Sequence, residues 1–418
     1  MQNKMQTWKK LILSLCFVAV FSMAFHTVSS IFERKDSREH FNKFWEDPGE
    51  YDVWFMGTSH IRYSMQPLEL WREYGIRSYN LAAPSSYLSQ TYWTLMCALE
   101  YSQPQVIVLD TYKVQRDVKN TEGKLIHTGF DEIPLSVEKV KAICDLFSTW
   151  DNRFEYLCDF SIYHNRWENL GRHDFYVEPS VTNGGKFKDR IVDKTDFKII
   201  PKDEKSGTDT VSFSYLKKII EECKKRDIQL ILTNVPFCSN KKMQRAINAV
   251  PDLAKEHGVT FMDLTYEEQI VDFGVDFGDK AHVNLFGGKK LTDYVGNYLL
   301  ENSDVQDYRQ VEEVAEKWNR DLAKYDEMRL KELRNSELLK RYVQWLYDDR
   351  YTCYMYQKEE PTGILAREFA QLENITEISR KEAEDRLGAE LAGEYAFFVE
   401  DSEGNVLDIA VFQDGKRL

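Results

Sequence analysis

The sequence predicts an α/β protein in three layers, with a parallel sheet between two layers of helices. Three observations predict this class. Short apolar runs alternate with helix-like segments between residues 51 and 112, the same alternation resumes after residue 210, and turn residues follow the apolar runs. Apolar runs with few polar positions are typical of parallel strands that are buried on both faces. An apolar N-terminal segment and a different C-terminal region complete the predicted organisation.

The N-terminal segment predicts a membrane anchor. Residues 11–32 form an apolar run, and Lys9 and Lys10 precede it. About 20 apolar residues suffice to span the hydrocarbon layer. Positive charges before such a run favour a cytoplasmic N-terminus. We therefore expect residues 1–32 to be a cytoplasmic stub and a transmembrane signal-anchor, in a single-pass protein of the cell membrane whose remaining chain is extracytoplasmic.

Three alternatives remain for this segment. Ser22-Met23-Ala24 loosely resembles a signal-peptidase site, so the segment could be a removed signal peptide. Residues 13–16 loosely resemble a lipoprotein cleavage box, although Leu15 is bulky for the position before the cysteine. A buried helix of a globular domain is the third alternative. The sequence has no other long apolar run, so we expect one span at most.

The first part of the predicted core has a β-α-β pattern. Apolar runs bounded by turns indicate buried strands, and apolar residues three or four apart indicate helices. We expect strands at 52–56, 78–82 and 105–109, and helices at 67–74 and 90–101. An insertion of helices and loops over the sheet edge is expected at about 113–210, because that stretch is polar with aromatic clusters.

The second part of the core follows the insertion. We expect helices at 215–226, 242–256 and 285–300, and strands at 228–235 and 259–263. The character changes near residue 303, which we take as the end of a domain comprising residues 50–303. Residues 308–347 contain no glycine or proline and predict long helices, and a hairpin is expected from strands at 395–400 and 406–412. Residues 304–418 are thus predicted to be a smaller α+β appendage.

Composition excludes some classes of partner and cofactor. The net charge of −14 gives an acidic surface, which repels phosphate backbones, so we expect no nucleic-acid partner. None of the seven cysteines forms a C-x-x-C pair, and free, buried thiols are favoured over a disulfide framework. Asp276, Asp279 and His282 lack a second pair of ligands nearby, so we expect no metal and no cofactor.

Two distant segments carry the groups of a nucleophilic serine site. Ser59 directly follows the first predicted strand, and Asp279 and His282 precede the last core helix. Loops at the carboxyl ends of parallel strands meet at one edge of the sheet. A serine hydroxyl needs an imidazole to accept its proton and a carboxylate to orient that imidazole. We therefore predict these three residues to be catalytic, with Gly57 allowing a sharp turn close to the substrate.

Each of the three residues also has a structural alternative. Ser59 could be the N-cap of the following helix, His282 a helix-entry histidine and Asp279 an exposed loop acid.

These segments resemble two blocks of the SGNH (GDSL) hydrolase superfamily. Gly57-Thr58-Ser59 resembles the Gly-Asp-Ser nucleophile block, and Asp279-x-x-His282 resembles the late Asp-x-x-His block. The run from His282 to Gly287 is similar to the family's His-Pro-Asn-x-x-Gly entry into its final helix. The resemblance covers roughly residues 50–300. It implies the flavodoxin-like three-layer SGNH hydrolase fold and a serine nucleophile.

The chain departs from the family pattern around the oxyanion hole. Ser85 stands where a glycine normally gives a backbone N–H, and Thr58 replaces the aspartate of the first block. The third block, Gly-x-Asn-Asp, is missing after the third strand, so Tyr112 and Asn234 are candidates for its asparagine donor.

Three further side chains have two interpretations each. His60 either lines the pocket or only packs, and His164 is favoured as structural over a substrate contact. Asn284 is a substrate contact or, as we favour, a cap of the helix that follows it.

The departures, the anchor and His60 together resemble one branch of the superfamily, whose members acylate alginate, teichoic acids or other exported polymers. That resemblance implies O-acyl transfer to a polysaccharide through an acyl-Ser59 intermediate, with a multi-pass membrane O-acyltransferase as partner. Two alternatives stay open: a carbohydrate esterase of the same fold, and a non-catalytic scaffold that binds a glycan or a partner.

Overall fold

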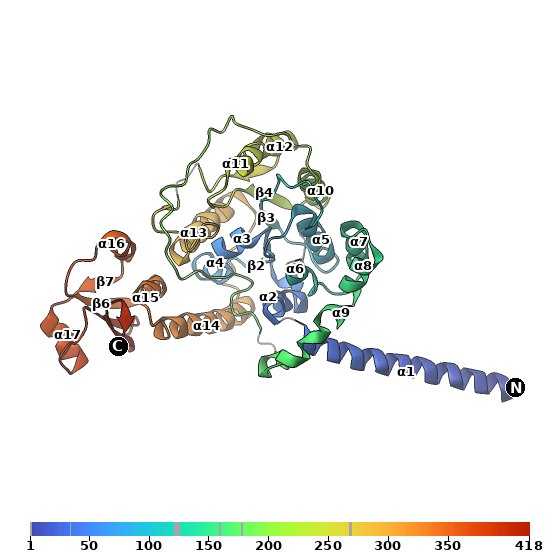
Figure 1. The fold of residues 1–418 in the computed structure, drawn as a ribbon, viewed down its shortest axis with the longest axis horizontal. Helices are drawn as coiled ribbons and strands as arrows, with labels where there is room; N and C mark the ends of the chain where they lie inside the picture. The colour runs from blue at the N-terminus through green and yellow to red at the C-terminus, as the bar shows by residue number, and fades with distance from the viewer. Residues whose placement is uncertain (1, 34, 121–125, 159, 177–178, 267–269) are drawn as a thin grey trace.

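The computed structural model describes residues 2–33, 35–120, 126–158, 160–176, 179–266 and 270–418 (Figure 1). Its centre is a parallel sheet in the order β2-β1-β3-β4-β5. The strands are β1 (Val53–Met56), β2 (Ser78–Asn80), β3 (Val106–Asp110), β4 (Gln229–Thr233) and β5 (Thr260–Met262). This is the 2-1-3-4-5 order of one class of doubly wound sheets. The predicted α/β class and all five predicted strands are confirmed.

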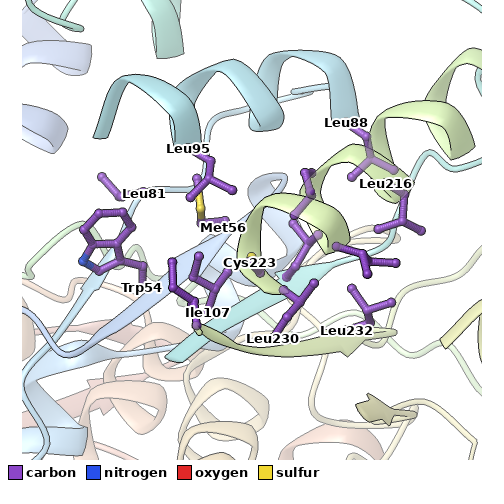
Figure 2. Packing of buried hydrophobic residues seen from close by; sticks show 14 of the residues in the cluster. Trp54, Met56, Leu81, Leu88, Leu95, Ile107, Leu216, Cys223, Leu230 and Leu232 are labelled. Carbon is purple, nitrogen blue, oxygen red and sulfur yellow. The ribbon is translucent and has the colours of Figure 1, made fainter. Parts of the chain in front are cut away.

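Alternate residues of the strands supply two hydrophobic cores, one on each face of the sheet. Trp54, Met56 and Ile107 point to one face, where α5 (Leu88–Ala98) and α10 (Val211–Lys225) cover them. Figure 2 shows this core, with Leu95 and Leu216 of the helices above the strand residues. The opposite core joins the other strand residues to α3 (Ser59–Ser64), α4 (Pro67–Tyr74) and α13 (Leu285–Asn302). The three-layer arrangement follows from this alternation.

The prediction of a single helix at 242–256 is wrong, because two helices lie there. α11 (Lys241–Ile247) ends before Asn248, and α12 (Val250–His257) has Pro251 in its first turn. Proline lacks a backbone N–H and fits the first turn of a helix much better than its interior. The proline therefore begins a second helix at this point.

The insertion forms a helical layer outside α5. It contains α6 (His127–Phe130), α7 (Val137–Leu146), α8 (Trp150–Leu157), α9 (Phe160–Tyr163), η2 (His164–Asn169) and η3 (Arg172–Asp174). Phe130, Ile143 and Tyr156 form a small core there with Cys97 of α5. Figure 1 shows α7 and α8 beside α5, on the outside of the domain. The remainder of the insertion is extended and brings Lys188 to the segment before α13.

The N-terminal helix α1 (Gln2–Phe32) projects away from the domain (Figure 1). Within it, Gln6–Phe32 is long and apolar enough to cross a membrane. No residue of its most apolar 18-residue stretch is buried in the protein. The interpretation as a core helix of a globular domain is therefore wrong. The sequence did not predict α2 (Lys35–Glu46), which buries Phe41 and Phe44 in the main core and precedes η1 (Pro48–Glu50).

The C-terminal region contains a second sheet, in the order β10-β9-β8-β6-β7. The predicted hairpin is confirmed as β8 (Tyr395–Glu400) and β9 (Val406–Gln413). The elements not predicted are β6 (Thr352–Gln357), α16 (Gly363–Phe369), β7 (Ile375–Glu377), α17 (Arg380–Leu387) and β10 (Lys416–Arg417). The long helical stretch consists of α14 (Glu312–Arg334) and α15 (Leu339–Leu346).

A buried charge network joins this region to the central domain. Arg329 of α14 lies 3.1 Å from Glu69 of α4 and 2.9 Å from Asp348, and all three side chains are almost fully buried. The Tyr325 hydroxyl donates a further hydrogen bond of 2.9 Å to Glu69. Phe286 of α13 also packs within the core of the second sheet. The appendage is therefore packed firmly against the central domain.

Candidate active site

The turn after β1 presents Ser59. Gly57 has a φ of +131°, which residues with a side chain rarely adopt. A Cβ atom on it would lie 2.8 Å from the Cβ of Asp110. Thr58 is the N-cap of α3, and its Oγ1 accepts a hydrogen bond from the His60 N–H at 3.3 Å. Ser59 is thus the first residue of α3. Its alternative interpretation as the helix cap is wrong, and its half-buried hydroxyl is not used in capping.

The three predicted catalytic side chains meet. His282 Nε2 lies 2.9 Å from Ser59 Oγ, across 223 residues of sequence. His282 Nδ1 lies 3.0 Å from each carboxylate oxygen of Asp279. With the Nδ1 proton on the carboxylate side, Nε2 is free to accept the proton of the serine hydroxyl. Residues 276–284 hold this arrangement in a tight turn, in which Asp279 Oδ1 also accepts the Ala281 and His282 N–H groups.

A lysine stabilises the ionised form of Asp279. Lys188 Nζ, from the extended part of the insertion, lies 3.1 Å from Asp279 Oδ2. Partial burial favours a neutral Asp279, but the hydrogen bonds from His282 and the Ala281 N–H outweigh it. With Lys188 adding to them, they hold the pKa of Asp279 well below its usual range. The carboxylate is therefore ionised at any pH at which the histidine can act as a base.

A second carboxylate, Asp110, supports the nucleophile turn from β3. Thr58 Oγ1 donates to Asp110 Oδ2 at 2.8 Å, and the Tyr112 N–H donates to Oδ1 at 3.0 Å. Burial raises the pKa of Asp110 to about 6, against the opposing effect of these hydrogen bonds. The sequence analysis did not identify Asp110 as part of the site. The available signal was an acidic residue that ends an otherwise apolar strand, at the position of the missing third block.

His60 packs behind the triad. Its ring lies between those of Tyr112, at 4.1 Å, and Phe237, at 4.4 Å, and its centroid is 5.6 Å from that of His282. Burial, with the nearby His282 and Lys113 adding to it, lowers the pKa of His60 well below its usual value. His60 is therefore a neutral, buried neighbour of His282. Tyr112 contributes its ring to the same cluster, and no hydrogen bond of its hydroxyl is found among the described residues.

The loop after β2 lies against the nucleophile turn. The Ala83 N–H donates to the Gly57 carbonyl at 3.2 Å, and Ser85, two residues further along this loop, has a φ of +57°. Within the described part of the chain, the backbone N–H groups of Ser59 and Ser85 donate no hydrogen bond. An oxyanion hole requires backbone N–H groups of this kind, without an acceptor of their own.

Lys113 binds the carbonyl of the peptide group between Ser85 and Ser86. Its Nζ donates to the Ser85 carbonyl at 2.7 Å, and its side chain is buried against the rings of Tyr87 and Tyr112. Burial lowers the pKa of Lys113 to about 8, with Arg116 adding to this effect and Asp110 opposing it. Nothing in the sequence distinguished this lysine from the surface lysines.

Two predicted polar residues have structural roles. The Asn234 amide donates to Asp263 Oδ1 at 3.1 Å and so joins the ends of β4 and β5. Asn284 is buried, accepts the Gly287 N–H at 3.2 Å and donates to the Val275 carbonyl at 2.7 Å. Both ends of its amide are thus used at the start of α13. Asn284 is the helix cap that we favoured, and its buried amide has no group left for a substrate. His164, at the start of η2, is exposed, and its Nδ1 bonds the Ser161 carbonyl at 2.9 Å.

Among the described residues, no group of three or more His, Cys, Asp or Glu side chains could hold a metal ion. The arrangement comprises a serine hydroxyl, an imidazole and a carboxylate in hydrogen-bonded series. No protein-family model matches this chain. No curated protein matches it with significant similarity.

Proposed function

We propose that this chain is a membrane-anchored serine acyltransferase of the SGNH type, which acylates a hydroxyl group of an exported or cell-envelope polysaccharide. The hydrogen-bonded series Ser59, His282 and Asp279 at one edge of the parallel sheet is the observation that carries the proposal. A scaffold that only binds a glycan has no need for a serine aligned on an oriented imidazole. The apolar helix α1 supports an anchored protein. The placement of the catalytic domain outside the cytoplasm rests on Lys9 and Lys10, which precede the apolar run.

The reaction has two steps. His282 Nε2 takes the Ser59 proton while Oγ attacks the acyl carbonyl of a donor, and the leaving group departs with the proton that His282 returns. A sugar hydroxyl then loses its proton to His282 and attacks acyl-Ser59. The ester passes to the sugar, and Ser59 regains its proton. A multi-pass membrane O-acyltransferase is the proposed source of the acyl donor.

The N–H groups of Ser59 and Ser85 are the proposed oxyanion donors. Lys113 holds the Ser85 carbonyl, and this hydrogen bond restrains the backbone at Ser85, whose own N–H belongs to the preceding peptide group. A charged lysine donates a stronger hydrogen bond to this carbonyl than a neutral one does. Lys113 thus offsets part of the loss of the family's asparagine donor, acting as a positioning residue.

Transfer and hydrolysis differ in the second step, so acceptor competition tests the proposal. The full-length protein in detergent would be given p-nitrophenyl acetate with and without a soluble oligosaccharide. We expect acetylated oligosaccharide to form as free acetate falls, with Ser59→Ala as the inactive control. Free acetate at an unchanged rate, with no acetylated sugar across a panel of neutral and uronic-acid oligosaccharides, would favour the esterase.

The role of Lys113 predicts a descending limb in the pH profile. Its pKa of about 8 means that the lysine is charged below this pH and loses its charge as the pH rises through it. The groups that face it are Tyr87, Tyr112, Arg116, Asp110 and the neutral His60. Asp110, with a pKa of about 6, titrates at lower pH. We expect the rate of acyl-Ser59 formation to fall above about pH 8.

Two variants check this assignment. Lys113→Arg should keep its charge and move the fall to higher pH. Lys113→Met should be slower below about pH 8, by up to about 10²-fold, the cost of one oxyanion donor, and should lack the fall above that pH. Stopped-flow measurement of the acylation burst gives the rates. Profiles that superimpose on that of the unmodified protein for both variants would show that Lys113 has no part in the reaction.

A further inference from the structure

We propose that α7, α8 and η2 of the insertion rest on the surface of the bilayer that α1 crosses, with their exposed apolar side chains among the lipid headgroups. We call these side chains, together with Leu135 before α7 and Phe175 and Tyr176 after η3, the membrane face. Its members are Leu135, Val137, Val140, Trp150, Phe154, Leu157, Trp167, Phe175 and Tyr176. The proposal depends on α1 as a membrane helix and is independent of the chemistry at Ser59.

Exposed apolar side chains are concentrated in this part of the molecule. Outside α1, half of the large hydrophobic residues that the described chain exposes belong to the membrane face. Trp150 is 77% exposed, Trp167 65% and Phe154 59%. Scattered single apolar residues on a surface need no explanation, but a concentration of them marks an interaction site.

The pattern on α8 shows an ordered face. Trp150, Phe154 and Leu157 are four and three residues apart, so they lie along one side of the helix. Tyr156 points inward and is buried in the core of the insertion. Val137 and Val140 repeat the same spacing on α7. Two neighbouring helices therefore each bury one side in the domain and expose an apolar side to the exterior.

The end of α1 is attached to the same segment. Phe160 of α9 packs edge-on against Phe25 and Phe32, with ring centroids 5.3 and 5.5 Å apart. Arg166 of η2 donates to the Phe32 carbonyl at 2.6 Å and is held by Asp174 at 2.7 Å. Figure 1 shows α8 and α9 on the side of the domain from which α1 projects. The membrane face therefore lies next to the point where α1 leaves the domain.

The length of α1 sets the depth of this contact. Lys9 and Lys10 must stay at the headgroup level on one side, and about 20 helical residues span the hydrocarbon layer. Twenty residues beyond Lys10 is Ser30, which lies between the two phenylalanines that Phe160 contacts. Phe160 and Arg166 thus lie near the second headgroup level. Tryptophan and tyrosine are enriched at this depth, because their rings are apolar with one polar atom.

Depth-dependent quenching tests the proposal in the full-length protein. The cysteines that are not buried, Cys16, Cys144, Cys158 and Cys238, are replaced by serine. Phe154→Cys then carries an environment-sensitive dye in phosphatidylcholine vesicles. Val406→Cys on β9, where the native side chain is 58% exposed, is the matched control. We expect lipids with headgroup-level nitroxides to quench the dye at position 154 several-fold more than the dye at 406. Trp167→Cys should behave as position 154 does.

Two outcomes would overturn it. Equal quenching at 154, 167 and 406 would show that the membrane face points into water. The dye at position 154 could instead be shielded from a water-soluble quencher in native membranes but not in pure lipid vesicles. That result would show that a protein covers this face. Adding Ser59→Ala should leave the quenching unchanged, so failure of the acyl-transfer proposal and failure of this one are separately visible.

Discussion

Ser59→Ala is expected to abolish the covalent reaction of this protein with a fluorophosphonate probe, and to lower acyl transfer by about 10⁴-fold or more. The reason is geometric. Ser59 Oγ is the only hydroxyl placed 2.9 Å from His282 Nε2 among the described residues, and without it the imidazole has no nucleophile to deprotonate. Intact-protein mass spectrometry measures the adduct, and peptide mapping should place it on Ser59.

Ser85→Ala is the matched control for this result. The proposed role of Ser85 uses its backbone N–H, which alanine retains, so Ser85→Ala should still be labelled. Circular dichroism of both variants would show that the fold is kept. An adduct that persists in Ser59→Ala would remove the serine-nucleophile proposal altogether.

The core of the fold was predictable because its signals are local. Each central strand is a short apolar run that ends in turn residues, as Val53–Met56 does before Gly57. Burial on both faces demands that pattern, so it is readable without any knowledge of long-range contacts. The meeting of Ser59 with His282 was predictable for a related reason. Parallel strands bring their carboxyl ends to one edge, whatever the separation in sequence.

The parts that escaped prediction depend on contacts between distant residues. α2 is polar overall and is fixed by two phenylalanines that insert into the main core. β6 carries only a partial apolar pattern, and β7 consists of three residues held by parallel pairing with β6. Lys113 gains its low pKa from burial between two tyrosine rings. Such surroundings arise only in the folded chain, and no spacing of residues in the sequence predicts them.

Asp110 supplies a carboxylate to the turn that carries Ser59. The Gly-Asp-Ser block would place an acid at position 58, where this chain has Thr58. In the structure, Asp110 comes from the neighbouring strand and bonds the Thr58 hydroxyl at 2.8 Å. A carboxylate therefore remains beneath the nucleophile turn, although it is supplied by β3. Gly57 permits this close approach because it has no Cβ to meet Asp110.

The second large effect is expected at Asp279. In Asp279→Asn, the amide can donate a hydrogen bond to His282 Nδ1, which would stabilise the tautomer with its proton on Nε2. That proton would point at Ser59 Oγ, so the histidine could no longer act as a base. The corresponding change in a serine protease triad lowers kcat by about 10⁴, and we expect a loss of the same order here.

Lys188→Met separates this effect from a change of charge alone. It removes the cation 3.1 Å from Asp279 Oδ2 but leaves the carboxylate in place to orient the imidazole. Asp279 is partly exposed to solvent, which screens the lysine, so we expect Lys188→Met to cost less than about 10-fold. The second-order rate constant of fluorophosphonate labelling measures both variants. Equal and small losses would mean that Asp279 does not select the tautomer of His282, and that the serine is activated in another way.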